Sequence, residues 1–252
     1  MNTRPKKDCL SCVLVLTAFV ALLPSEEARA EVVLGFYGGI AETFSCDVNL
    51  EQINGTDLKY KGVSWQGKSF ELPLYFGFRL SYWIHGLRNL GIMVDFTHAK
   101  MYAELDTTVT VTGLRRGTFI NRPERLGETF EELAFSHGHN LLTANILYRF
   151  FPKGERDKTI VGRMQPYLGL GFGVAFPHVE VAIDGTSTEE YQTTGPVAQV
   201  LGGLNFDIVK HLSLFLEYKL NYANMNIDLL DGGKLELGPW TNNFILGLAV
   251  YF

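Results

Sequence analysis

The sequence predicts an all-β protein, an eight-stranded antiparallel up-and-down transmembrane β-barrel with long extracellular loops. Apolar residues alternate with small or polar ones in segment after segment, which is the period of a β-strand. Beyond residue 30, no apolar run approaches the roughly eighteen residues of a membrane-spanning helix. Charged residues recur in mid-strand opposite the apolar face, as in a barrel with a polar lumen and a lipid-facing exterior.

Residues 1–30 are typical of a cleaved secretory signal peptide. A basic start precedes an apolar stretch at 9–23, and Ala28-Arg29-Ala30 has the small-residue pattern of a cleavage site. The barrel domain is therefore expected to span residues 31–252. Removing four of the 22 basic and three of the 27 acidic residues leaves 18 and 24, and this net charge of −6 argues against nucleic acid as a partner. Of the three cysteines only Cys46 would remain, which excludes an intrachain disulfide and gives little support for a reactive thiol.

Eight segments carry the alternating pattern. The clearest is 70–82, where Phe76, Phe78 and Leu80 share one face with four more apolar residues and Arg79 lies on the other. The predicted strands, in chain order, are 32–41, 70–82, 90–97, 142–150, 168–176, 198–206, 212–222 and 240–252. Eight is the smallest usual number for an outer-membrane barrel, whose interior is filled by side chains.

Charges on the inner faces should neutralise one another in the lumen, because an unpaired buried charge is costly. The predicted lumen network consists of Glu71, Arg79, Asp95, Arg149, Glu217 and Lys219. Long connections at 45–67, 107–131, 182–190 and 224–239 alternate with short turns at 85–89 and 208–211 and a charged turn at 151–164. Since such barrels have short periplasmic turns, the long loops should be extracellular and both termini periplasmic.

Unusual polar clusters fall at one rim of the predicted barrel. They are 65–71, 96–100, 136–140, 177–180 and 191–196, all at strand ends that point outward from the cell. Four of the six histidines lie there, and histidine can titrate, transfer protons or bind a metal near neutral pH. These histidines are His98, His137, His139 and His178.

The spacing of His178 and Glu180 projects both side chains from the same face, as it does for His137 and His139. This arrangement is compatible with metal ligation across adjacent strands. By strict alternation, however, His98, His178 and Glu180 face lipid whereas His137 and His139 face the lumen. One unified site would therefore need a β-bulge near Pro177. Otherwise these are interfacial polar residues that meet lipid head groups.

At these rim segments the chain resembles a family of alphaproteobacterial outer-membrane lipid A oxidases. The segments are Trp65-Gln66-Gly67-Lys68-Ser69-Phe70-Glu71, Phe96-Thr97-His98-Ala99-Lys100, Asn140-Leu141-Leu142-Thr143, Pro177-His178-Val179-Glu180-Val181 and Tyr191-Gln192-Thr193-Thr194-Gly195-Pro196. The resemblance covers most of the chain after residue 30 and depends on the order of these segments together. It implies oxidation of the proximal glucosamine of lipid A to 2-aminogluconate, with molecular oxygen as oxidant and hydrogen peroxide as product.

With that activity, a bound metal or other redox centre is expected, because ordinary side chains do not accept two electrons. The hypothesis is that His98, His178 and Glu180, with His137 or His139, bind a metal or act as catalytic bases. Lys68, Lys100, Glu71 and Tyr191 are the candidate substrate-binding residues, and the two lysines would hold lipid phosphates. Other cations that could meet lipopolysaccharide phosphates are Arg115, Arg116, Arg122 and Arg125. The expected partners are lipopolysaccharide and the outer membrane, and the expected state is a monomer.

Other functions remain open from sequence. The barrel could be non-catalytic and structural or bind ligands through its loops, or form a narrow channel, which eight strands disfavour. A deacylase that uses Ser136 and His137 is a further alternative. Adjacent residues in a strand point to opposite faces, which is a poor arrangement for a nucleophile and its base.

Overall fold

The computed structural model describes residues 31–151 and 161–252. The predicted signal peptide lies outside the described residues, as does most of the predicted turn at 151–164. Within the described part of the chain, no helix is long and apolar enough to cross a membrane.

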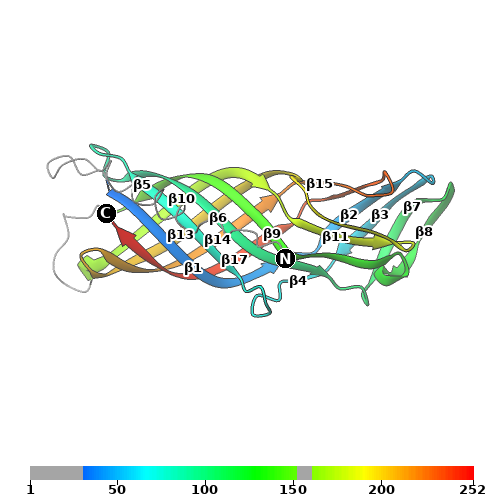
Figure 1. Cartoon of the computed structure of the whole chain (residues 1–252), viewed down its shortest axis with the longest axis horizontal. Helices are drawn as coiled ribbons and strands as arrows, with labels where there is room; N and C mark the ends of the chain where they lie inside the picture. Colours follow the sequence, from blue (N-terminus) through cyan, green and yellow to red (C-terminus); the bar gives the residue numbers. More distant parts are fainter. Residues whose placement is uncertain (1–30, 152–160) are drawn as a thin grey trace, which may run out of the picture. The chain divides into compact units, whose positions relative to one another are not determined.

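Eight long strands form a closed antiparallel barrel, as predicted (Figure 1). Each pairs with the next along the chain, and pairing of the last with the first and of β6 with β9 completes the closure. The barrel strands are β1 (Glu31–Thr43), β5 (Phe76–Trp83), β6 (Leu90–Ala103), β9 (Phe130–Arg149), β10 (Met164–Ala175), β13 (Gly195–Val209), β14 (Leu212–Ala223) and β17 (Trp240–Tyr251). The second strand begins at Phe76, so the expected start at residue 70 was wrong. Residues 67–75 form an irregular loop, which we call the side loop.

The outer faces of the barrel strands expose apolar side chains in a continuous belt. Phe78, Ile146, Leu170, Leu216 and Leu246 are each about half exposed or more. A row of large exposed apolar residues on every strand is stable only against hydrocarbon, and a closed barrel satisfies the backbone hydrogen bonds that hydrocarbon cannot. The barrel therefore spans a membrane.

Paired charges occupy the lumen. The guanidinium of Arg79 donates to Glu217 at 2.6 Å and lies 3.7 Å from the centre of the Phe215 ring. Lys219 pairs with Asp95, and this pair is almost completely buried. Neutralisation inside the lumen is thus confirmed for these four charged residues.

The other two predicted members of this network differ. Arg149 is buried and pairs at 2.6 Å with Glu31, which is the first residue of β1. Glu71 is not in the lumen, contrary to expectation, because the side loop carries it away from the barrel interior. Its carboxylate is mostly exposed and lies 3.7 Å from Lys68.

The long loops are themselves folded into strands. Six of these strands form a second antiparallel sheet in the order β15-β16-β2-β3-β7-β8. They are β2 (Cys46–Gln52), β3 (Thr56–Val63), β7 (Thr108–Arg115), β8 (Thr118–Arg125), β15 (Met225–Asp228) and β16 (Lys234–Leu237). In addition, the hairpin of β11 (His178–Ile183) and β12 (Thr186–Tyr191) pairs with β9, and β4 (Trp65–Gln66) pairs with β6. Single-turn 3₁₀ helices lie at Leu126–Glu128 and Val161–Arg163.

This second sheet and the upper parts of β6, β9 and β11 enclose an apolar core, and together they form what we call the loop region. Leu50, Tyr60, Met101 and Phe135 are completely buried in that core. Cys46 borders it, and burial raises the pKa of the Cys46 thiol to about 11, which keeps the thiol protonated and unreactive at neutral pH.

Candidate functional site

A wide bulge in β9 lies where the barrel passes into the loop region. Ala99 of β6 is opposite His139, whereas Met101 is opposite Phe135, so β9 has two extra residues across this step. Gly138 within the bulge has φ +132°, a conformation that side chains rarely adopt. The bulge turns the side chain of His137 out of the regular alternation, so that it reaches the same carboxylate as its neighbour Ser136. A bulge near Pro177 was expected to be needed for one unified site, whereas the observed bulge lies in β9.

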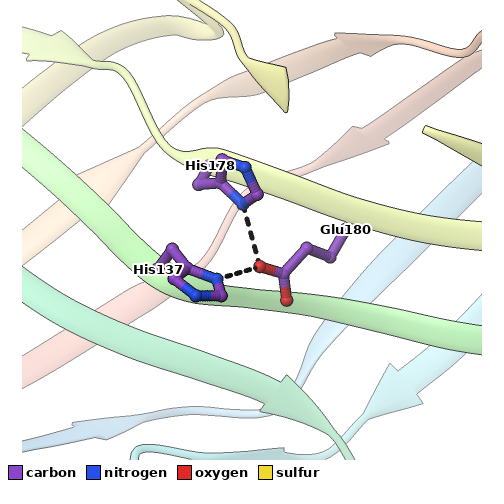
Figure 2. A group of neighbouring side chains, drawn as sticks. All are labelled: His137, His178 and Glu180. Carbon is purple, nitrogen blue, oxygen red and sulfur yellow. Dashed lines mark hydrogen bonds and ion pairs between the residues drawn. The ribbon is translucent and has the colours of Figure 1, made fainter. Parts of the chain in front are cut away.

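The bulge brings His137 next to His178 and Glu180, which we call the histidine cluster (Figure 2). One carboxylate oxygen, Glu180 Oε1, lies 2.7 Å from His137 Nδ1 and 2.8 Å from His178 Nδ1. The two imidazole rings meet edge to face with centroids 5.2 Å apart. The Glu180 side chain is 8% exposed, whereas that of His137 is 65% exposed. The cluster thus has a buried carboxylate and an accessible imidazole.

Two hydroxyl groups complete the surroundings. Ser136 donates to Glu180 Oε1 at 2.7 Å. Tyr191 packs edge to face on His178, and its hydroxyl donates to the backbone carbonyl of His137 at 3.3 Å. Burial alone would raise the pKa of Glu180, but the hydrogen bonds from Ser136, His137 and His178 outweigh it and lower that pKa below its usual value. Glu180 is therefore an anion at neutral pH.

The donor set of the cluster fits a divalent metal ion. Two imidazole nitrogens and one carboxylate oxygen lie within 4.8 Å of one another. Ligands about 2.1 Å from a metal are about 3 Å apart when adjacent. The two nitrogen–oxygen separations of 2.7 and 2.8 Å are close to that value, and the rings would have to turn to bring the two nitrogens to it. Two histidines and one carboxylate are the ligand set of non-haem iron oxygenases, and zinc accepts the same atoms.

His98 and His139 lie outside this cluster. His98 Nδ1 bonds the side-chain oxygen of Asn140 at 2.8 Å, and its ring stacks on Phe76. His139 is completely buried and packs near Phe135. Of the predicted metal set His98, His178 and Glu180, the structure brings the last two together with His137 and not with His98, because the bulge changes the direction of residue 137.

The predicted substrate-binding residues occupy the same wall of the barrel. Lys68 lies 4.5 Å above the ring of Tyr102. Lys100 is buried, and its ammonium donates to the backbone carbonyls of Glu71 and Leu72 at 3.0 and 2.9 Å. A phosphate contact by Lys100 would therefore require the side loop to move, whereas Lys68 and Tyr191 are accessible at the surface.

The four arginines predicted to meet phosphates lie in the β7–β8 hairpin of the loop region, away from the cluster. Each has a carboxylate partner there. Arg115 and Arg122 bond Glu124, Arg116 bonds Asp184 at 2.8 Å, and Arg125 bonds Asp106.

Two contacts were not predicted from the sequence, that of Lys68 with the ring of Tyr102 and that of Ser136 with Glu180. Gly138 was the available signal, because a glycine between two histidines in a strand is a frequent site of a bulge.

A closed eight-stranded barrel with an apolar exterior and a filled, charge-paired lumen defines the chain as an outer-membrane β-barrel protein. Solved structures with a similar fold are known. OprG from Pseudomonas aeruginosa is 13% identical with a TM-score of 0.46, and the match covers 89% of this chain and 97% of that one. Neisserial surface protein A is 16% identical with a TM-score of 0.40, covering 90% and 100%.

The outer membrane enzyme PagL is 9% identical with a TM-score of 0.26, covering 85% of this chain and 98% of that one. No protein-family model and no curated protein matches the chain. At these identities and scores the comparisons concern the fold alone, and the assignment to the class depends on the belt and the lumen of this chain.

Proposed function

We propose that the chain is an outer-membrane enzyme that oxidises the proximal glucosamine of lipid A to 2-aminogluconate with molecular oxygen. The observation that carries the proposal is the histidine cluster, in which two imidazoles converge on one buried carboxylate oxygen. It lies just beyond the lipid-facing belt at the end with the long loops, which is the extracellular end in such barrels. Sugar head groups of outer-leaflet lipid A lie at that depth. The resemblance of the rim segments to lipid A oxidases supports the same activity.

The reaction balances with oxygen as the only oxidant. The anomeric carbon of a free hemiacetal loses two electrons and two protons to form a lactone, and oxygen takes them up as hydrogen peroxide. Hydrolysis of the lactone then gives the acid, so the lipid gains one oxygen atom in total. The anomeric hydroxyl must be free, because a phosphate on that oxygen leaves no proton to remove.

His137, His178 and Glu180 are the residues that would hold a divalent metal, which when bound would supply the redox chemistry that side chains lack. In the observed geometry Glu180 Oε1 can accept from both Nδ1 atoms and so orient the two imidazoles. This leaves the other ring nitrogen of His137, the most exposed of the three residues, in a position to accept the hydroxyl proton of the sugar. With a metal bound, these same three atoms would be its ligands. Ser136 and Tyr191 offer hydroxyl groups beside them for the neighbouring sugar oxygens.

The arrangement disfavours a serine-based deacylase. In a catalytic triad the base uses one ring nitrogen for the serine and the other for the carboxylate. Here Ser136 Oγ lies 3.0 Å from His137 Nδ1, and the Glu180 carboxylate is hydrogen-bonded to the same nitrogen. Ser136 donates directly to that carboxylate, so its hydroxyl is not aligned for activation by His137.

The test is mass spectrometry of lipid A from cells that lack the modification and express the protein, grown with and without oxygen. The lipid A should carry a free anomeric hydroxyl. We expect one added oxygen with the unchanged protein in air, and a loss of at least about 100-fold in His178→Ala and Glu180→Gln. His85→Ala is the matched control, because His85 lies exposed in the turn at the opposite end of the barrel.

To identify the ion, metal is removed from the purified protein with a chelator, and single metal ions are then added back until oxidation returns. Unchanged oxidation in His137→Ala and His178→Ala would remove the cluster from the reaction. No oxidation by the unchanged protein would remove the activity itself and favour a structural or ligand-binding barrel.

A further inference from the structure

The side loop, residues 67–75, lies against the outside of the barrel wall, except that the side chain of Tyr75 at its end enters the interior and donates to Asn243. Asp95, Thr97 and Ala99 of β6 face the interior, so Lys100 belongs to the outward face of that strand. Its ammonium nevertheless is buried, because the backbone of the side loop covers it and accepts both of its hydrogen bonds. In Figure 1 the loop, in cyan beside β4, projects from the side of the barrel.

The loop is held in a fixed conformation. Besides the two bonds from Lys100, the backbone N–H of Tyr75 donates to the carbonyl of Ser69 at 3.0 Å. The hydroxyl of Ser69 accepts from the backbone N–H of Ala41 in β1 at 3.0 Å. Bonds to two different barrel strands therefore fix which side chains the loop presents outward.

The side chains it presents are large and apolar. Phe70 and Leu72 are 82% and 84% exposed, more than any other phenylalanine or leucine of the described residues, and Leu74 is 49% exposed. The row continues directly into Phe76 and Phe78 of the lipid-facing belt. An exposed apolar group that is continuous with a hydrocarbon-covered surface is stable when the same hydrocarbon covers it.

The polar neighbours of the loop suit the membrane interface. Lys68 precedes the apolar residues and stacks on the ring of Tyr102. A lysine and a tyrosine beside inserted apolar side chains are typical of the level where acyl chains meet head groups. Tyr102 in turn lies opposite Ala134 of β9, two residues before Ser136, which donates to Glu180 of the histidine cluster. The loop therefore borders the segment of β9 that carries the cluster.

We propose that the side loop inserts Phe70, Leu72 and Leu74 among the acyl chains of the outer leaflet and forms a lipid-binding surface beside the histidine cluster. The partner is an outer-leaflet lipid, which reaches the cluster from the side of the barrel and not through the lumen. This surface goes beyond the proposed oxidation, since the loop would contact lipid whether or not the lipid is oxidised.

Spin labelling tests the insertion directly. Leu72→Cys, in a Cys46→Ser background, carries the label in the protein reconstituted in phospholipid vesicles. Collisions with oxygen, which concentrates in hydrocarbon, are compared with collisions with a water-soluble nickel chelate. The matched controls are Leu170→Cys, 62% exposed in the belt, and Phe119→Cys, 67% exposed in the β7–β8 hairpin.

We expect the oxygen-to-nickel ratio at residue 72 to match that at 170 and to exceed that at 119 several-fold. Phe70→Cys should behave in the same way and serves as the second variant. A ratio at both 70 and 72 equal to that at 119 would overturn the proposal. Because the measurement needs no turnover, lipid contact without oxidation would count against the oxidase only, and oxidation without lipid contact would count against the side loop only.

Discussion

The barrel and the loop region share strands but bury opposite kinds of side chains. In the barrel part of β9, Thr143, Asn145 and Arg149 face the interior and Ile146 faces outward. In the loop region the same strand buries Leu133 and Phe135 in an apolar core. Water is the solvent outside the loop region and hydrocarbon is the solvent outside the barrel, so the polarity of the interior reverses along one strand.

The reversal coincides with the bulge at Gly138. The two extra residues of the bulge leave the inward face of β9 unchanged, since Leu133 and Phe135 before it and Thr143 after it all point inward. The histidine cluster arises within the bulge, because His137 leaves the face that alternation assigns to it. The candidate site thus lies where two folding environments join, at the bulge between the barrel part and the loop part of β9.

Removing one charge from the lumen tests whether paired charges stabilise the barrel. Of the substitutions that we propose, it should give the largest loss in the free energy of unfolding. Lys219→Ala leaves Asp95 buried without its partner, and we expect a loss of about 3–5 kcal/mol in the free energy of unfolding. Urea unfolding of the protein in vesicles measures it. The double variant Asp95→Asn, Lys219→Met should recover most of the loss, since it leaves no net charge in the lumen. Equal losses in the single and double variants would contradict charge pairing as the cause.

The sequence predicted the barrel well because alternation over eight or more residues assigns one face of each strand to lipid and the other face to the lumen. The error at the start of β5 came from Phe70, Leu72 and Leu74, which continue the alternation although no neighbouring strand pairs with them. Hydrophobic period alone does not separate a strand that faces lipid from a loop that lies against lipid.

The second sheet was missed for a different reason. Its strands are four to eight residues long and carry polar or charged outer faces, so they were expected to be loops. Val48 with Leu50 and Leu58 with Tyr60 do alternate and pair with one another in a hairpin. Their other neighbours, such as Val111 opposite Tyr60 and Leu235 opposite Leu50, lie far along the chain. For the cluster, the spacing of His178 and Glu180 was informative. The choice between His98 and His137 depended on a bulge whose position alternation does not give.

A cavity in the apolar core of the loop region tests whether that core is stabilised separately from the barrel. Leu58 is buried between β2 and β7, and Leu58→Ala should lower the local stability by about 3 kcal/mol. Hydrogen exchange should show faster opening of β2 and β3 with the barrel strands unchanged. Phe119→Ala, at an exposed position, is the control and should stay within about 0.5 kcal/mol. If the barrel strands open together with β3, the two regions are one cooperative unit and their separation in this comparison is wrong.

The smallest effect concerns an ion pair on the loop region. Glu124 is buried, which would raise its pKa, but bonds from Arg115 at 2.6 and 3.0 Å and from Arg122 at 2.6 Å lower it below the usual 4.5. A carboxyl whose pKa is lower in the folded state stabilises that state above its unfolded pKa, and the contribution disappears as pH falls through the folded pKa. The protection of β7 and β8 from hydrogen exchange, measured relative to the intrinsic exchange rate at each pH, should therefore fall below about pH 4.5. Glu124→Gln should be less stable at pH 7 and should lack that part of the acid dependence. If the pH dependence of hydrogen exchange is unchanged in Glu124→Gln, the prediction is wrong. The loss of stability in acid would then come from other carboxylates of the loop region, such as Asp47, which pairs with Lys59.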